Sequence, residues 1–352
     1  MDTLSHGLVG SILTRSTTQR PEGRAALWIG FLAAMLPDLD FLFLHGQLDY
    51  LRNHRGWSHS FLYLPLFAAG VAGIARLFFR RARLLHLFLF AALGIASHIV
   101  FDWITSFGTM FLTPLSRERY SLDWLFIIDP FFTAIGGFGL LIAAALRGRG
   151  RRAASIASGL LALYILFCAA VHARALAVWR RIDHAPSGAP VAVLPQLLSP
   201  FRWLGLSDHG DSLHACFFDI GPFASDVPVP ITPEKLSEAL GRLPEFYPPP
   251  DRARIRRFEK PADSPLLAAA RALPDVQTYL AFARFPLATV MPSADGTTAI
   301  TFEDMRFLPF FTGPWARTKS GGLTRVAFVY RVRLDGAGRP LERGFVVGGR
   351  GR

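Results

Sequence analysis

Histidine and aspartate recur in the apolar first half of this sequence at spacings that suit metal coordination. His98 and Asp102 are four residues apart, which places both side chains on one face of a helix. His54 and His59 are five residues apart, a spacing that suits a bent loop, and Gly56 between them permits the bend. Mixed imidazole and carboxylate ligands suit zinc, manganese or iron better than calcium, which prefers oxygen alone. The pattern predicts a site for a divalent transition metal.

Asp38 and Asp40 add two carboxylates to the candidate ligands. They cannot share one face of a regular helix, but Pro37 allows irregular backbone at this point. The sequence leaves open which of the two is a ligand, and a carboxylate that is not a ligand would be the candidate general base. Arg55 lies between the two loop histidines, where it could bind an anion in bidentate fashion. These ligands exceed the four of one tetrahedral zinc site, so one or two ions are expected.

Other histidines and aspartates have simpler interpretations. Asp129 precedes Pro130, and capping a helix explains it as well as metal binding does. His172 is expected to hydrogen-bond a neighbouring helix. Ordinary interface or surface positions are expected for His45, His86, His184, His209 and His214.

Long apolar segments carry the candidate ligands. Charged residues make up only 18% of the 352 residues, and the net charge is +12. The arginines lie in short clusters between apolar runs, which favours a membrane protein over a nucleic-acid-binding one. A bilayer core needs about 20 mostly apolar residues per helix. Five or six segments are predicted: Ala25–Leu44, Phe61–Phe79, Leu84–Thr105, Trp124–Leu146, Ala153–Trp179 and the short Leu4–Leu13.

The arginines of the loops predict an orientation, because cytoplasmic loops are richer in positive charge. The richer side carries Arg15, Arg20, Arg24, Arg80, Arg81, Arg83, Arg147, Arg149, Arg151 and Arg152. The other side carries Arg52, Arg55, Arg117, Arg119, Arg180 and Arg181. The candidate ligands all lie towards this second side, which is expected to be periplasmic.

The sequence changes character after Trp179. Prolines mark a linker, and β-rich runs follow. Strands are predicted at Ser212–Ile220, Gln277–Arg284, Thr297–Glu303 and Thr324–Leu334, a hairpin turn at Asp295-Gly296, and helix starts at Thr232-Pro233 and Ser264-Pro265. No disulfide is expected between Cys168 and Cys216. The prediction is an α-helical membrane domain with a metal site over residues 1–182. A soluble α+β domain with a mostly antiparallel sheet follows over 183–352, on the same side.

Five short motifs in the first 135 residues together resemble the YdjM-type family of bacterial inner-membrane proteins, which are described as metal-dependent hydrolases. They are MDTLSHGLVG, LPDLD, HRGWSHS, SHIVFDWITSFGT and the DP at Asp129-Pro130, and RFP and FEDMRF later in the chain are also similar. The resemblance adds His6 to the ligand set. More distantly, the order of these ligands resembles that of zinc phospholipase C and P1-type nucleases.

The leading hypothesis is a membrane-embedded hydrolase that uses a metal-activated water on a phosphoester in a lipid or lipid-linked substrate. Its ligands would be His6, Asp38, Asp40, His54, His59, His98 and Asp102, and Arg55 would bind the phosphate. The alternative is a non-enzymatic, metal-stabilised membrane protein that binds lipid or an envelope partner. A metal or proton transporter would need polar residues that continue towards the other face, and the sequence has almost none there.

Overall fold

The structure is a computed structural model and describes residues 1–18, 22–146, 148–222, 247–308 and 328–346. The chain forms two compact units, Met1–His172 and Ala173–Arg352. The sequence predicts a domain boundary between residues 182 and 183, at the end of the last apolar helix. The boundary between the two units instead falls within that helix, between His172 and Ala173.

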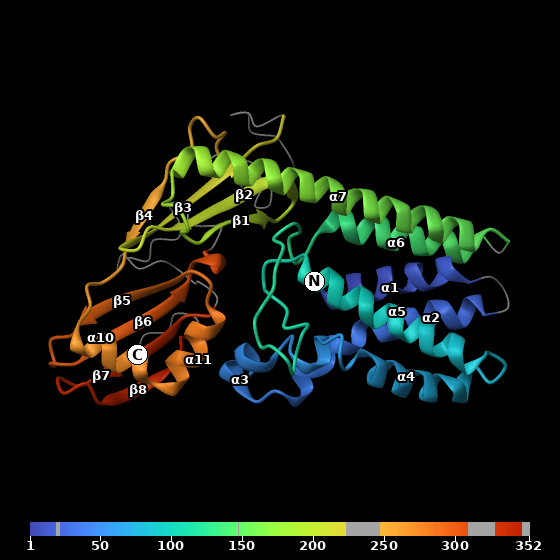
Figure 1. Ribbon diagram of the computed structural model, residues 1–352, viewed down its shortest axis with the longest axis horizontal. Helices are drawn as coiled ribbons and strands as arrows, with labels where there is room; N and C mark the ends of the chain where they lie inside the picture. Colours follow the sequence, from blue (N-terminus) through green and yellow to red (C-terminus); the bar gives the residue numbers. More distant parts are fainter. Residues whose placement is uncertain (19–21, 147, 223–246, 309–327, 347–352) are drawn as a thin grey trace, which may run out of the picture. The chain divides into compact units, whose positions relative to one another are not determined.

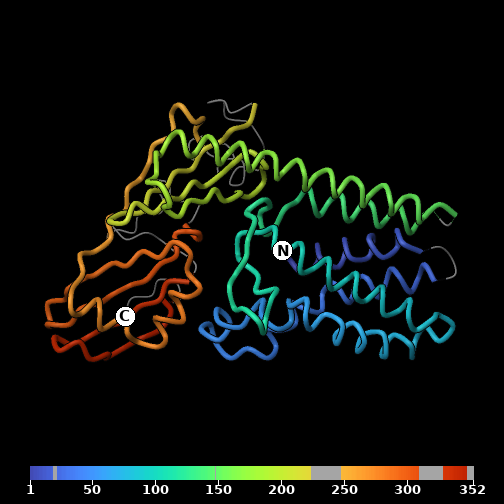
Figure 2. Tube along the Cα trace, viewed as in Figure 1, coloured from blue at the N-terminus to red at the C-terminus, as the bar shows by residue number. Residues whose placement is uncertain are grey.

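Helices make up the first unit, and Figure 1 shows α1, α2, α4 and α5 running alongside one another. The helices are α1 (Thr3–Thr17), α2 (Gly23–Met35), α3 (Gly46–Asn53), α4 (Leu64–Phe78), α5 (Leu84–Trp103), α6 (Pro130–Ala145) and α7 (Gly150–Asp183), with short 3-10 helices η1 (Leu36–Phe43) and η2 (Trp57–His59). Figure 2 shows the N-terminus beside the end of α5, and the backbone N–H of Asp2 donates to the carbonyl of Ile127 in the loop that follows this helix.

The described residues include three helices that are long and apolar enough to cross a membrane: Gly23–Phe43, Leu84–Trp103 and Gly150–Asp183. A fourth crossing results if Gly46–His59 and Leu64–Phe78, which meet at a bend of 72°, count as one span. The predicted count of five or six is therefore not confirmed. Part of the difference lies at Trp124–Leu146, because Asp129 caps the helix and Pro130 begins it, so that only Pro130–Ala145 is helical.

Small residues let α1 and α2 pack closely, as is usual between helices in membranes. A Cβ atom on Gly30 would lie 2.0 Å from Thr14 Oγ1 and 2.5 Å from the carbonyl oxygen of Gly10. Thr14 Oγ1 in turn donates to the carbonyl of Ala26 at 2.6 Å. This contact fixes α1 against the helix that leads into η1.

The second unit contains two four-stranded sheets in which every neighbouring pair of strands is antiparallel. One sheet is formed by β1 (Val191–Gln196), β2 (Ser199–Asp208), β3 (Ser212–Asp219) and β4 (Arg256–Glu259), and the other by β5 (Pro286–Pro292), β6 (Thr298–Asp304), β7 (Tyr330–Leu334) and β8 (Pro340–Phe345). Helices α10 (Pro265–Ala272) and α11 (Pro274–Phe282) accompany the second sheet (Figure 1).

Most of the predicted elements of this unit are confirmed. Strands lie at Ser212–Asp219 and Thr298–Asp304, Gly296 adopts a φ of +78° in the turn between β5 and β6, and the Ser264 side chain caps α10 by accepting from the N–H of Leu267. Thr232-Pro233 and the start of Thr324–Leu334 lie outside the described residues.

The strand predicted at Gln277–Arg284 is wrong, because most of this stretch belongs to helix α11. Pro274 occupies its first turn, and Val276, Tyr279 and Phe282 form its buried face at a spacing of three residues. That spacing is helical, and it outweighs the local β propensity.

Candidate metal centre

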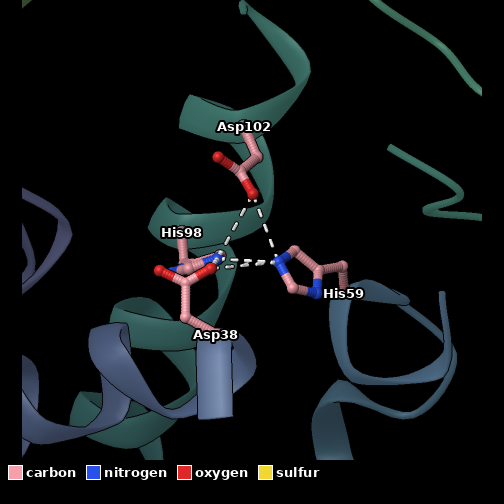
Figure 3. Close-up of side chains that lie close together, drawn as sticks. All are labelled: Asp38, His59, His98 and Asp102. Carbon is pink, nitrogen blue, oxygen red and sulfur yellow. Dashed lines mark hydrogen bonds and ion pairs between the residues drawn. The ribbon is translucent and has the colours of Figure 1, made fainter. Parts of the chain in front are cut away.

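Four of the predicted ligands converge on one point in the first unit (Figure 3). Asp38 comes from η1, His59 from η2, and His98 and Asp102 from α5. Each contributes one nitrogen or oxygen atom, and these four atoms lie within 4.8 Å of one another. We call these four residues the His/Asp cluster.

The distances within the cluster match a tetrahedral metal site. Nε2 of His59 lies 2.9 Å from Nε2 of His98, 3.7 Å from Asp38 Oδ1 and 3.2 Å from Asp102 Oδ2. Nε2 of His98 lies 3.5 Å from Asp38 Oδ1 and 3.4 Å from Asp102 Oδ2. Zinc bonds of 2.0–2.2 Å at tetrahedral angles would separate ligand atoms by roughly 3.3–3.6 Å. Four of the five separations lie within about 0.1 Å of this range and the separation of the two nitrogens is shorter, so the atoms are gathered closely enough to hold one such ion.

The backbone explains how η1 contributes one carboxylate to the cluster and not two. Pro37 stands in the first turn of this 3-10 helix, which has about three residues per turn. Asp38 and Asp40 therefore point in different directions. Asp38 reaches the cluster with one oxygen and accepts from Thr3 Oγ1 with the other, at 2.6 Å.

The hydrogen bonds of the two histidines place a proton on Nδ1 of each ring. Nδ1 of His98 lies 2.6 Å from the carbonyl oxygen of Ala34, which can only accept, so this nitrogen carries the proton. Ser58 Oγ donates its hydrogen to Asp40 at 2.8 Å and so accepts from Nδ1 of His59, also at 2.8 Å. Each ring therefore uses Nδ1 for this hydrogen bond and turns Nε2 towards the cluster, an orientation that suits an imidazole ligand of a metal ion.

Asp102 divides its two oxygens between the cluster and a set of donors. Oδ1 lies 2.8 Å from the Arg55 guanidinium and 3.2 Å from His6 Nε2, and it also accepts from the α-amino group of Met1. Oδ2 is buried and has no hydrogen-bond partner among the described residues. Burying a carboxylate oxygen without a partner is costly, and a cation in the cluster would remove that cost.

Asp40 and His54 form a layer behind the cluster. Asp40 accepts from His54 Nδ1 at 2.8 Å and from the backbone N–H of Arg55 at 3.2 Å, in addition to Ser58. These contacts hold the loop that carries His59. Gly56 allows the loop to turn, since a Cβ atom there would lie 2.8 Å from the carbonyl oxygen of Asn53.

The other predicted site residues occupy positions around this centre. The ring of His6 stacks on that of His98 with centroids 3.7 Å apart. Arg55 is 2% exposed, and its guanidinium contacts Asp102, Thr105 and the face of Phe107. A phosphate contact by Arg55 stays a prediction.

Asp129 is not part of the centre. It caps α6 by accepting from the N–H of Phe132 at 2.8 Å, and the hydroxyl of Tyr164 donates to its carboxylate at 2.9 Å. Of the two interpretations that the sequence allows, the helix cap is the one that the structure describes.

Two kinds of residue escape the sequence analysis. Thr3 and Ser58 orient ligands through hydrogen bonds. In the sequence, the only signal for such residues is a hydroxyl side chain near a predicted ligand. The second unit also holds a mixed group, Asp183, His209 and His214, whose nitrogen and oxygen atoms gather in the same way. His209 and His214 are therefore not the ordinary surface residues that their sequence context suggests.

Comparisons with known proteins agree with the resemblance noted in the sequence. The model of the family "YdjM inner membrane protein" matches residues 1–175. The chain is 32% identical over 139 residues to a Bacillus subtilis protein named "Uncharacterized protein YfhP", covering 37% of this chain and 42% of that protein. It is 34% identical over 110 residues to "Inner membrane protein YbcI" of Escherichia coli, covering 30% of this chain and 63% of that protein.

The chain thus spans about half the length of these curated relatives. No solved structure is significantly similar to it. The matched region contains every residue of the His/Asp cluster and of the layer behind it. Through residues 1–175, the chain belongs to the YdjM inner membrane protein family.

Proposed function

We propose that this protein is a membrane-embedded, metal-dependent hydrolase that acts on a phosphoester in a lipid or lipid-linked substrate. The observation that carries the proposal is the convergence of Nε2 of His59 and Nε2 of His98, which lie 2.9 Å apart, with two carboxylate oxygens. Structural zinc sites are usually rich in cysteine, whereas catalytic sites use histidine with carboxylate. The cluster contains no cysteine.

The proposed roles follow from burial and hydrogen bonding. Asp38, His59, His98 and Asp102 would hold the ion, for which zinc is the first choice and manganese or iron the next. When bound, it would acidify a water molecule and polarise a phosphoryl oxygen. Asp38 is 12% exposed while the other three side chains are fully buried, so water would reach the cluster at Asp38.

Asp40, His54 and Arg55 are positioning residues in this proposal. Asp40 orients His59 through Ser58, and Arg55 balances the charge of Asp102. Arg55 and the α-amino group of Met1 both place positive charge on Oδ1 of Asp102. A second dication beside that oxygen would be repelled, so we favour one ion over two.

The surroundings of the cluster support a lipid substrate. The segments that carry Asp38 and His59 expose large apolar side chains, which suit contact with acyl chains at the membrane surface. They are Leu39, Phe41, Leu42, Phe43, Trp57, Phe61 and Leu62. Arg52 and Arg117 are exposed near the same loop, and Arg117 donates to Asn53 at 2.6 Å, so both could attract a phosphate group. We place this site at the periplasmic face of the inner membrane, as the loop arginines predict.

The test is elemental analysis and an activity screen on the full-length protein purified in detergent. Lipid phosphodiesters and phosphomonoesters would be the substrates. Asp102→Ala and His59→Ala should each lose both bound metal and hydrolysis, while His45→Ala, a change at an exposed histidine outside the cluster, should lose neither. Full activity in both cluster variants would contradict the mechanism.

A second candidate function is a metal-stabilised scaffold without catalysis. It is favoured by one observation, namely that four protein ligands already complete a tetrahedral shell and three of them are fully buried. X-ray absorption spectroscopy distinguishes the two. A shell that contains at least one water oxygen supports the hydrolase, and a shell of four protein ligands in an inactive protein supports the scaffold.

A further inference from the structure

We infer that the second unit carries a metal site of its own, formed by Asp183, His209 and His214, which would bind a zinc-type divalent ion. The three side chains come from separate places in the sequence: the end of α7, the turn between β2 and β3, and β3 itself. One nitrogen or oxygen atom from each lies within 4.8 Å of the others. This inference does not depend on the His/Asp cluster.

The carboxylate of Asp183 is the centre of the group. Its Oδ2 lies 2.9 Å from Nε2 of His209, and its Oδ1 lies 2.6 Å from Nδ1 of His214. Ser207 also donates to Oδ2. The Asp183 side chain is 1% exposed and each histidine side chain is 17% exposed, so the carboxylate is buried while solvent reaches the rings.

The two imidazole rings are held face to face. Their centroids lie 3.7 Å apart, with 25° between the ring planes. A single dication could contact one nitrogen of each ring and one oxygen of the carboxylate, the three atoms that gather here. Two imidazoles and one carboxylate form a ligand set of the kind that leaves one position open in zinc enzymes.

The positions of these residues are built into the fold. Ser207 and His214 are directly paired across β2 and β3, so they lie on the same face of the sheet. Trp179 lies one turn before Asp183 on α7, and its Nε1 donates to Ser207 Oγ at 3.0 Å. Gly205 makes room for the indole, because a Cβ atom there would lie 2.4 Å from it. An ion here would join the end of α7 to the β2–β3 hairpin.

The experiment counts zinc in the full-length protein after equilibration with Zn²⁺ and removal of the excess. The variant His209→Ala with His214→Ala should bind one zinc per chain fewer than the unmodified protein, whatever the occupancy of the His/Asp cluster. The converse variant, His59→Ala with His98→Ala, should keep this zinc. Co²⁺ that replaces the zinc in this variant should give the visible absorption of a site with imidazole ligands.

Two further variants keep the result decisive. Asp183→Asn preserves the shape of the side chain and should also lose the zinc. This variant tests the site even if the double histidine variant does not fold correctly. His184→Asn changes the exposed neighbouring histidine, whose φ of +50° asparagine tolerates, and should lose none. Unchanged zinc in both His209→Ala/His214→Ala and Asp183→Asn would overturn the inference and leave a hydrogen-bonded group only.

Discussion

Nε2 of His59 and Nε2 of His98 lie 2.9 Å apart, and in both rings Nδ1 is hydrogen-bonded to an acceptor outside the cluster. Two ring nitrogens at this distance need a proton or a metal cation between them, because two bare lone pairs would repel each other. The acceptors that hold the rings in this arrangement come from different elements, Ser58 in η2 and the Ala34 carbonyl in α2. The fold therefore prepares these two rings for a cation before one binds.

Removing the metal should destabilise the first unit. A ligand present at a hundred times its Kd stabilises the folded state by about 2.7 kcal/mol, and this contribution is lost when a chelator removes the ion. Thermal unfolding in detergent with and without EDTA measures the effect. The Tm should fall on chelation and recover with Zn²⁺, and the fall should be smaller in His59→Ala with His98→Ala, which retains only the ion of the second unit. An equal response in that variant would place the stabilising ion elsewhere.

Breaking the connection from His59 through Ser58 to Asp40 should weaken metal binding without abolishing it. Changes to residues that orient a ligand usually cost roughly 10- to 100-fold in metal affinity. Ser58→Ala and Asp40→Asn should therefore show weaker zinc binding at the His/Asp cluster in competition titrations, while the cluster still fills at saturation. Ser60→Ala serves as the control, because this hydroxyl of the same loop donates to the carbonyl of Thr113 instead. If Asp40 were itself a ligand, Asp40→Asn would lose the ion at any concentration.

The part of this centre that the sequence predicts is the part set by local geometry. A spacing of four residues on a helix brings His98 and Asp102 together. Pro37 makes η1 irregular enough for the side chains of Asp38 and Asp40 to point in different directions. The distinction between His54 and His59 depends on which hydroxyl or carboxylate approaches each ring. Those partners arrive through tertiary packing, which spacing alone does not encode.

The second unit shows the same limit. Alternating residues and turn residues predict β3, β6 and the turn at Gly296, because these signals are local. The group of Asp183, His209 and His214 requires the end of α7 to meet a hairpin more than twenty residues later in the chain. In the sequence, His209 and His214 are isolated histidines in a polar region, and nothing there indicates their contact with Asp183.

Arg55 should contribute more to stability than to substrate binding. Its guanidinium is buried against Asp102, and removing one partner of such a pair costs about 3–5 kcal/mol because the other charge is left unpaired. Arg55→Gln should therefore lower the Tm strongly, and Arg55→Lys should lower it less. The exposed Arg52→Gln is the control. A raised KM for a phosphoester with an unchanged Tm in Arg55→Gln would instead support the phosphate contact.

Both cysteines should be unreactive in the folded protein. Cys168 and Cys216 are free and each is 3% exposed. Burial raises the pKa of the Cys216 thiol to about 12. At pH 8 its thiolate fraction would then be roughly one in 10⁴, far below that of an ordinary cysteine. Ellman's reagent should detect no fast thiol in detergent at pH 8 and two per chain after unfolding. Rapid labelling of native Cys168→Ser would show that Cys216 is accessible.

Gly30 should control metal affinity although it is not a ligand. A Cβ atom there would collide with Thr14 Oγ1 and the Gly10 carbonyl, so Gly30→Ala must push α1 away from α2 at a cost of about 1–3 kcal/mol. Helix α2 supplies the Ala34 carbonyl that orients His98 and leads directly into η1, which carries Asp38. Shifting it should lower both the Tm and the zinc affinity. Gly73→Ala in α4 is the matched control, because a Cβ atom there meets nothing within 4 Å. Lower stability with unchanged zinc affinity in Gly30→Ala would mean that the cluster is held by its own loops and not by the packing of α1 on α2.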